Sequence, residues 1–512
     1  MSKRSFIFLT SLTILLVTIP YLFAARSGGD RLIFNGFLLN PIDGNSYLSK
    51  MREGWLGEWQ FSLLNSSQAP EGSFLFLFYI FLGHVSRLLG LPLIFTFHAA
   101  RVMSAFLLCL MLYRFIDVYL AERSQGTKTI AFALLCFGSG LGWLSAFFGG
   151  FTADFWVAEA YPFLSMYSNP HFPLGLALIL DFFVQMRNSV TRNGFFGLVF
   201  KGIMLAIVMP FGVVVAGLVA GGVQLWEIIE KESAIRWWML GFLAPGGLFL
   251  VYQYIVIQSD PVLSGWNTQN LTPTPPLWDL LISFSPALIL AVGVVIWGIK
   301  SGEVANYKLP VVWLAAGIIL AYVPFQLQRR FLFGYFIPVA CLAAIALDRL
   351  AISARRWSRI GVVAIVAASL ISNLFIWIGS VSAAASHQPE LYYSGSIQDA
   401  FDWMLIHRQD NSVVLAAPGT SSLIPGATGW RVVYGHPFET PHADQRKREV
   451  EDIFSGEMSL VDMQQYFESL GIDTIFVGPY ERELGGNLAW TKEFPVVYEN
   501  AEVTIYKTGV DS

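Results

Sequence analysis

Asp43 is a carboxylate whose surroundings could support catalysis. It lies in the segment Asn40-Pro-Ile-Asp43-Gly, a turn sequence that follows a long apolar run near the N-terminus. A carboxylate in such a turn could take a proton from an incoming hydroxyl group. It could equally form an Asx-turn or cap a helix without any catalytic task. The residues alone leave both interpretations open.

A helical pattern follows directly after this turn. Leu48, Met51 and Trp55 share one face of the predicted helix, whereas Lys50 lies off that face. Such a pattern is typical of a short helix that lies on a membrane. We therefore expect Trp55 and Trp59 at the level of the lipid headgroups.

Two adjacent arginines, Arg329 and Arg330, stand between two apolar runs. Arginine matches the geometry of phosphate oxygens, and exposing two of them to lipid would be costly. They could bind a lipid phosphate, or they could extend toward the membrane interface with no binding role. Arg101, inside a long apolar run with His98 one turn earlier, is a further candidate for the phosphate.

Two other polar groups could contribute to a site. Asp154 and Glu159 lie in one loop, and His171 begins the next apolar run; together they could hold a sugar or a divalent cation. They could instead be solvated loop acids and a capping histidine. His436 and Glu439 lie in a polar cluster between a predicted strand and a predicted helix. They could recognise a sugar or an acceptor, or cap that helix.

The composition indicates what must position these residues. Apolar residues make up 55% of the 512 residues and charged residues only 13%, which is typical of a membrane protein. The net charge of −4 and the lack of a basic stripe argue against nucleic acid as a partner. Three cysteines, all inside apolar runs, indicate buried small side chains rather than disulfides or zinc ligands.

Long apolar runs predict about eleven transmembrane helices. The run at 74–82 is too short to span, so we expect an interfacial or half-inserted helix there. Pro210 interrupts 197–227, which we divide into two short spans. The remaining spans are expected at 5–25, 93–116, 129–149, 171–187, 236–257, 279–299, 309–325, 331–349 and 359–379.

The distribution of basic residues predicts the orientation. The loop at 349–359 is rich in arginine and is expected in the cytoplasm together with the N-terminus. Segments 26–92, 150–170, 258–278 and 326–330 then face outward, as does the chain after about residue 380. In that tail, alternating helical and strand patterns predict a small α/β domain. We therefore expect a transmembrane domain over 1–380 and an extracytoplasmic α/β domain over 381–512.

An acidic residue in the first outer loop, followed by an amphipathic helix, resembles the GT-C superfamily of integral-membrane glycosyltransferases. This superfamily includes protein O-mannosyltransferases and lipid A aminoarabinose transferases, which use polyprenyl-phosphate sugars. Many members carry two adjacent acids at this place, whereas Gly44 follows Asp43 here. The resemblance implies that Asp43 is the catalytic base. It also implies that Arg329 and Arg330 bind the phosphate of the donor.

The leading hypothesis is a multi-pass plasma-membrane glycosyltransferase that works on the extracytoplasmic side. It would move a sugar from a polyprenyl-phosphate donor to a hydroxyl group of a lipid, glycan or protein acceptor, with inversion at the anomeric centre. A divalent cation is a candidate cofactor, and no soluble nucleotide sugar is expected because there is no Gly-rich phosphate loop. The alternatives are a transporter or lipid flippase, and a non-catalytic envelope protein on the same scaffold.

Overall fold

The computed structural model describes residues 1–187, 192–352 and 356–509. Residues 353–355 of the predicted cytoplasmic loop lie outside this range. The described chain divides into two compact units. The helical unit contains Met1–Pro20, His98–Val251 and Thr272–Val381. The mixed unit contains Tyr21–Phe97, Tyr252–Leu271 and Ser382–Ser512, so the first predicted outer loop and the C-terminal tail belong to one compact unit.

The helices that lie wholly or largely in the helical unit comprise long apolar helices and several short ones between them. They are α1 (Lys3–Ser27), α4 (Leu93–Tyr119), α5 (Gln125–Phe137), α6 (Gly142–Ala146), α7 (Ala153–Trp156), α8 (Pro162–Ser168), α9 (His171–Gln185), α10 (Arg192–Val208), α11 (Pro210–Ile229), α12 (Met239–Ser259), α14 (Leu277–Phe284), α15 (Ala287–Ser301), η1 (Val304–Tyr307), α16 (Lys308–Ala321), η2 (Gln328–Leu332), α17 (Phe336–Ile352), α18 (Arg356–Ala368) and α19 (Ile371–Ala385).

Within the described residues, eight helices are long and apolar enough to cross a membrane, or nine if the bent pair α14 and α15 is one span. The predicted count of about eleven is therefore not confirmed. Several predicted runs form helices that are too short for this criterion, such as His171–Gln185 and Gly194–Val208. The chain is nevertheless a multi-pass membrane protein by the number and length of its apolar helices.

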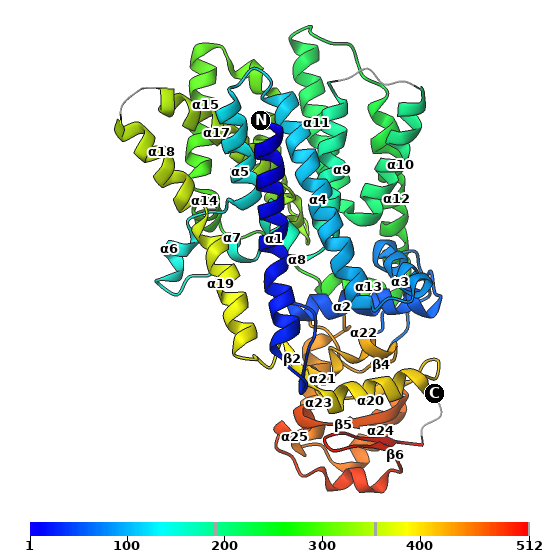
Figure 1. Cartoon of the computed structure of the whole chain (residues 1–512). Coiled ribbons are helices and arrows are strands. Elements are labelled where there is room, and N and C mark those ends of the chain that lie inside the picture. The colour runs from blue at the N-terminus through cyan, green and yellow to red at the C-terminus, as the bar shows by residue number, and fades with distance from the viewer. Residues whose placement is uncertain (188–191, 353–355, 510–512) are drawn as a thin grey trace. The chain divides into compact units, whose positions relative to one another are not determined.

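Helix α17 forms the centre of the helical unit. In the apolar stretch that contains α17, 94% of the residues are buried, whereas 17% are buried in the corresponding stretch of α12. It contacts α5, α15 and α16 along its length, and Figure 1 shows α5 and α15 beside it. The three cysteines are buried and free, as their apolar surroundings predicted.

The mixed unit is built around a five-stranded sheet with helices on both faces. Its helices are α2 (Pro41–Leu56), α3 (Leu77–Leu89), α13 (Pro261–Gln269), α20 (Gly395–Ile406), α21 (Pro418–Ser421), α22 (Ile424–Thr428), α23 (Ala443–Ser455), α24 (Leu460–Leu470), α25 (Pro479–Glu483) and η3 (Leu488–Glu493). Its strands are β1 (Leu32–Phe34), β2 (Tyr392–Ser394), β3 (Val413–Leu415), β4 (Arg431–Val432), β5 (Ile472–Val477), β6 (Val496–Glu499) and β7 (Thr504–Lys507).

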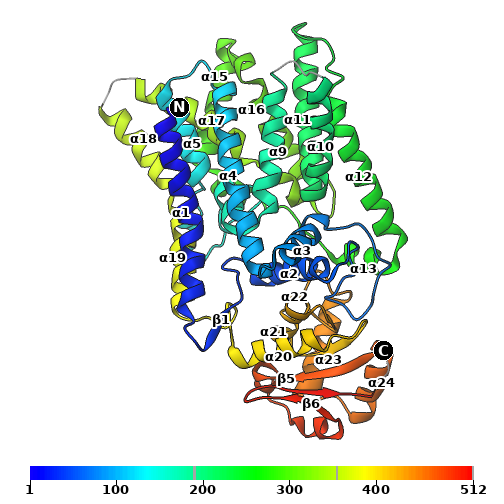
Figure 2. The same cartoon turned by 45° about the vertical axis from the view of Figure 1, so that its right-hand side comes forward.

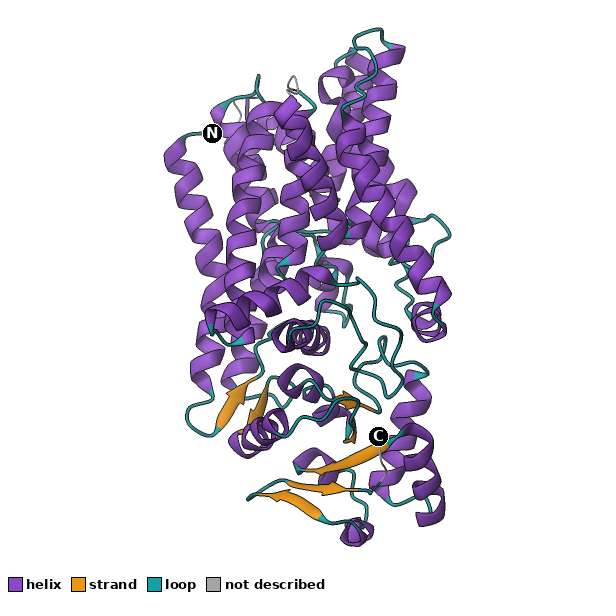
Figure 3. Ribbon diagram, turned by 90° about the vertical axis from the view of Figure 1, so that its right-hand side faces the viewer, coloured by secondary structure: helices purple, strands orange, loops and turns teal. Residues whose placement is uncertain are grey.

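The strand order in this sheet is β4-β3-β5-β7-β6. Strands β4, β3 and β5 are parallel, whereas β7 and β6 form an antiparallel hairpin at one edge. Figure 3 shows strands of the sheet in orange with helices beside them, and Figure 2 labels α20, α23 and α24 next to β5 and β6. One apolar cluster contains Val450 and Phe467, and a second contains Phe401 and Trp430. Every residue of β3 and β5 is buried because both faces of the sheet are covered. The predicted α/β character of the tail is confirmed.

The first outer loop joins the tail through backbone pairing. Strand β1 pairs antiparallel with β2, with Ile33 opposite Tyr393. Helices α2 and α3 cross closely, as Figure 2 shows. A Cβ atom at Gly54 would lie 1.9 Å from the carbonyl oxygen of Ile80, and one at Gly83 would lie 1.9 Å from that of Met51. The two glycines therefore permit direct contact between the backbones of the two helices.

The predicted distribution of buried residues around α2 is only partly correct. Met51 is buried as expected, but the other buried residues include Ser46, Ser49, Lys50 and Glu53. The pattern of apolar residues could not reveal this polar face, because it is buried by polar partners elsewhere in the mixed unit.

Candidate functional site

Asp43 and His436 form a hydrogen-bonded pair in the mixed unit. The Oδ1 atom of Asp43 lies 2.9 Å from Nε2 of His436, although 393 residues separate the two in sequence. His436 is buried, with 4% of its side chain exposed, whereas 36% of the Asp43 side chain is exposed. The structure therefore brings together two of the residues singled out in the sequence. It leaves the carboxylate open to an incoming molecule.

The local backbone fixes the orientation of the His436 ring. The backbone N–H groups of Phe438 and Glu439 both donate to its Nδ1 atom, at 3.0 and 3.2 Å. Since Nδ1 accepts these bonds, the proton of a neutral ring is on Nε2, which then donates to Asp43. The hydroxyl of Thr440 in turn accepts from the backbone N–H groups of Gly435 and His436. The histidine thus acts as a fixed donor to Asp43.

The start of α2 holds Asp43 from the other side. Asn40 is the N-cap residue, with a left-handed backbone at φ 48°, and Pro41 occupies the first turn. The amide nitrogen of Asn40 donates to Oδ2 of Asp43 at 2.6 Å, and its oxygen accepts from the Asp43 backbone N–H at 3.4 Å. Each carboxylate oxygen of Asp43 thus accepts one hydrogen bond and retains a further lone pair. Both interpretations of Asp43 from sequence, a cap partner and an accessible base, fit this geometry.

A buried ion pair connects the same two segments about two helical turns further along α2. Nζ of Lys50 lies 2.7 Å from Oε1 of Glu439, and the Lys50 side chain is completely buried. Ser46 also donates to Oε1, and the amide of Asn65 donates to Oε2. The ring of Phe76 lies under the ammonium group at 4.4 Å. This network holds α2 against the loop that carries His436.

The charge of Glu439 is set by these partners. Burial raises its pKa, but the positive charge of Lys50, the electrostatic effect of His436 and the hydrogen bonds from Lys50 and Ser46 outweigh burial and lower the pKa to about 2. Glu439 is therefore ionised at neutral pH. Its position explains why His436 and Glu439 stand so close in sequence: one contacts Asp43 and the other anchors the helix that carries Asp43.

The helical unit contains a separate cluster around Glu159. Its Oε1 atom lies 3.2 Å from Nε of Arg329 and 3.9 Å from Nη1 of Arg330, and its side chain is 3% exposed. The guanidinium of Arg329 lies over the ring of Trp156 at 4.8 Å. Two arginines and one glutamate leave an excess of one positive charge. The structure thus unites Glu159 with the two arginines, which sequence reasoning had placed in different groups.

The remaining candidates of the helical unit have structural partners. Asp154 is fully buried and accepts from the backbone N–H groups of Gly140 and Gly142 and from Thr152. Burial raises its pKa despite these bonds. These contacts join the loop before α7 to the loop before α6.

Arg101 and His171 are buried as well. Nη1 of Arg101 donates to the backbone carbonyls of Val17 and Met166, at 2.8 and 3.0 Å, and Nε donates to His98. His171 begins α9 and packs against Phe172. The contacts of Arg101 favour a role in joining α1, α4 and α8.

Metal binding was tested on the described side chains. No group of three or more His, Cys, Asp or Glu residues gathers there in a way that could hold a metal ion. In particular, Glu159 is paired with arginines and Asp154 with backbone N–H groups. A divalent cation therefore stays a prediction, with no ligand set for it among the described side chains.

Three residues of the site were missed in the sequence: Ser46, Lys50 and Asn65. Lys50 was predicted only to lie off the apolar face of its helix, and Asn65, in the sequence Asn65-Ser-Ser, was noted only as a match to the glycosylation sequon. The sequon asparagine is in fact buried and hydrogen-bonded to Glu439. The one available signal was a lone lysine within an otherwise uncharged turn of α2, which is too common to identify a buried pair.

Comparison with known proteins shows the class of the fold. No protein-family model matches the chain, and no curated protein matches it. Solved structures do match: an oligosaccharyltransferase from Archaeoglobus fulgidus, tethered with an acceptor peptide, has a TM-score of 0.56 at 11% identity, over 100% of this chain and 74% of that one.

Two further structures agree. The oligosaccharyltransferase AglB of the same organism, in complex with an inhibitory peptide and a dolichol-phosphate, has a TM-score of 0.51 at 11% identity, over 91% of this chain and 69% of that one. The arabinofuranosyltransferase AftD from Mycobacteria has a TM-score of 0.51 at 14% identity, over 100% of this chain and 40% of that one. These proteins are GT-C glycosyltransferases, so the chain has the GT-C fold. The resemblance inferred from the first outer loop is confirmed at the level of fold.

Proposed function

We propose that this protein is an inverting glycosyltransferase that moves a sugar from a polyprenyl-phosphate donor to an acceptor hydroxyl on the extracytoplasmic side of the membrane. The observation that carries the proposal is the pair of Asp43 and His436, a half-exposed carboxylate held by a buried histidine, in a chain with the GT-C fold. A fold alone does not define a reaction, so the proposal depends on what these residues can do.

Asp43 acts as the general base in this proposal. The acceptor oxygen attacks the anomeric carbon and loses its proton to Asp43, while the bond from the anomeric carbon to the phosphate oxygen breaks. The polyprenyl phosphate leaves with the electron pair of that bond. His436 is a positioning residue: its hydrogen bond to Oδ1 directs the carboxylate without contacting the substrate.

Arg329 and Arg330 bind the donor phosphate. Guanidinium groups present parallel N–H donors to phosphate oxygens, and the excess positive charge of the Glu159 cluster complements a negative headgroup. The same charge would stabilise the leaving phosphate as its bond to the sugar breaks. Arg101 has no part in this proposal, because its donors contact backbone carbonyls.

The proposal includes an orientation. The N-terminus lies in the cytoplasm, and the first loop and the C-terminal domain lie outside, as the distribution of arginines predicts. Labelling of single introduced cysteines in intact cells tests this. A cysteine at Glu457 in the tail should react with an impermeant reagent, and one at Ser2 should not.

Glycosyl transfer by the purified protein tests the reaction. Radiolabelled polyprenyl-phosphate sugars are offered to the wild type and to Asp43→Asn, with Asp30→Asn as a matched control, since Asp30 is an exposed acid of the same loop. Loss of a general base should lower the rate by about 10² to 10⁴, while donor binding survives. Equal rates for Asp43→Asn and the wild type would remove Asp43 from the mechanism. A wild type that transfers no sugar from any donor would refute the proposal as a whole.

A further inference from the structure

A cavity in the mixed unit adjoins the pair of Asp43 and His436. Its volume is about 510 Å³, within the range of about 300 to 1,000 Å³ that is common for small-molecule sites. One wall is the first turn of α2, which contributes Asn40 and Asn45 on either side of Asp43. Gly435 and Pro437, the neighbours of His436, form another part of the wall. Asp43 and His436 do not themselves line the cavity, but a molecule bound here would contact the sequence neighbours of both residues.

Two polar groups of the wall are available to a ligand. Asn45 is 6% exposed, and within the described residues its side chain has no hydrogen bond partner. The hydroxyl of Tyr434, a residue that is 8% exposed, likewise has none there. Asn35 provides the contrast, because its amide donates to the Glu390 carbonyl and accepts from the backbone of Phe37. The amide atoms of Asn45 are not among the fully buried polar atoms that lack a partner, so they remain accessible from the cavity and can hydrogen-bond to a polar ligand.

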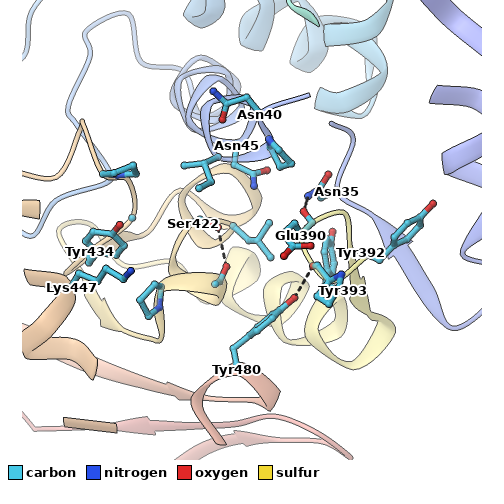
Figure 4. Close-up of a pocket in the computed structure, with 18 of the residues that line it drawn as sticks. Asn35, Asn40, Asn45, Glu390, Tyr392, Tyr393, Ser422, Tyr434, Lys447 and Tyr480 are labelled. Atoms are coloured by element: carbon cyan, nitrogen blue, oxygen red, sulfur yellow. Dashed lines mark hydrogen bonds between the residues drawn. The ribbon is translucent and has the colours of Figure 1, made fainter. Parts of the chain in front are cut away.

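Tyrosines also line the cavity, among prolines and aliphatic side chains. Figure 4 shows Tyr480 across the cavity from Asn45, with Tyr392 and Tyr393 beside it. Gly419 allows close packing beside the Tyr480 ring: a Cβ there would lie 3.1 Å from that ring. The Tyr480 hydroxyl donates to the carbonyl of Pro389, which holds the ring in place. Flat aromatic faces next to amide and hydroxyl groups suit a ligand with both C–H faces and hydroxyl edges.

The charged residues that line the cavity indicate which charge its ligand should carry. Glu390 and Glu483 line it together with a single cation, Lys447. Their sum is −1, which disfavours an anionic ligand. A lipid phosphate or an acidic sugar is therefore a poor match for this cavity.

We infer that this cavity binds a neutral saccharide, which is the acceptor of the proposed reaction. The role of this saccharide as an acceptor rests on the proposed function, but its binding can be tested without any transfer reaction. The Asn45 amide hydrogen-bonds to sugar hydroxyls, and the Tyr480 ring stacks on a pyranose face. One hydroxyl of the same sugar then lies toward Asp43. A glycan, rather than a peptide, is the class of acceptor that this wall favours.

Saturation-transfer NMR on the full-length protein in lipid nanodiscs tests the inference. The probes are neutral methyl glycosides and disaccharides, the corresponding uronic acids, and short peptides that contain serine or threonine. We expect a saturation-transfer signal from a neutral saccharide, weaker signals from the uronic acids, and no signal from the peptides. Asn45→Ala should weaken saccharide binding about 3- to 10-fold, which is the effect of losing one neutral hydrogen bond.

Control variants separate recognition from folding. Gln464→Ala removes an exposed amide from α24, outside the cavity, and should bind the saccharide as the wild type does. Tyr480→Phe retains the ring and should bind, whereas Tyr480→Ala should not. Thermal unfolding of Asn45→Ala should match that of the wild type, since no bond within the described residues is lost.

The outcomes distinguish this inference from the proposed function. Saccharide binding that Asn45→Ala weakens supports the inference even if no donor gives transfer, and that result would count against the proposed function alone. Saccharide binding that Asn45→Ala leaves unchanged would overturn the inference. Binding of the peptides instead of the saccharides would overturn it as well, as would an absence of binding by all neutral saccharides.

Discussion

The variant Glu439→Gln tests the most specific energetic claim of the site. The substitution keeps the shape of the side chain but removes its negative charge. Lys50 would then remain buried among Tyr47, Phe61 and Phe76, with an uncompensated ammonium group. The hydroxyl and carbonyl of Ser46 and the amide oxygen of the new glutamine could still accept from it, but none of these groups carries a negative charge.

The expected loss follows from the pKa of Glu439. A fall from the ordinary value of 4.5 to about 2 corresponds to about 3 kcal/mol of stabilisation at neutral pH. Because the folded pKa is the lower one, this stabilisation is complete above about pH 4.5 and is lost as the pH falls toward 2. Breaking a buried ion pair from one side generally costs about 3 to 5 kcal/mol, which is consistent.

Hydrogen exchange of the protein in nanodiscs measures the loss of stability locally, in the amides of α2. A loss of about 3 kcal/mol should accelerate exchange in residues 41–56 about 100-fold at pH 7. Glu457→Gln, an exposed glutamate in the same unit, is the control and should leave that exchange unchanged. The double variant Lys50→Met with Glu439→Gln should recover most of the loss, since no buried charge then lacks a partner. If Glu439→Gln exchanged as slowly as the wild type, the ion pair would not hold α2 in place.

Three further substitutions give distinct outcomes. Burial, opposed by Ser62 and by the charges of Lys50 and Arg431, raises the pKa of Glu53 to about 7, so its ionisation destabilises the fold as the pH rises from about 4.5 through 7. Glu53→Gln should therefore stabilise the protein at pH 8 by about 1 to 3 kcal/mol relative to pH 5 in thermal unfolding, and an equal effect at both pH values would contradict this. Arg329→Lys should weaken binding of undecaprenyl phosphate about tenfold in a lipid-binding assay, because lysine lacks the parallel donors; unchanged affinity would argue against phosphate recognition. Arg101→Met should lower the unfolding temperature, whereas the folded fraction should bind the lipid normally; a selective loss of lipid binding would restore Arg101 to the site.

The sequence predicted the fold better than the site. Long apolar runs identify membrane helices without any knowledge of tertiary contacts, and the alternation in the tail identified β3 and β5 for the same reason. The count of about eleven spans is not confirmed, since an apolar run such as the 15-residue helix α9 can be helical without meeting the length that a span needs.

The site depends on contacts that no local pattern contains. Asp43 could be selected by its place after the first helix, and His436 by its polar neighbours, but 393 residues separate them. The pattern placed Lys50 off the apolar face of its helix and gave no sign that it is buried, because lysine is rarely buried without a partner. Its burial becomes favourable only through Glu439, a partner that an inspection of residues 41–56 cannot supply.

The separation between Lys50 and Glu439 also has a consequence for biogenesis. Lys50 is synthesised 389 residues before its partner, which corresponds to a delay on the order of 20 to 80 s at typical rates of translation. During that interval α2 has no carboxylate to neutralise its ammonium group, and Asp43 has no histidine to orient it. A nascent or truncated chain therefore carries an immature base, and the carboxylate acquires its final geometry only after the last domain has been made and folded.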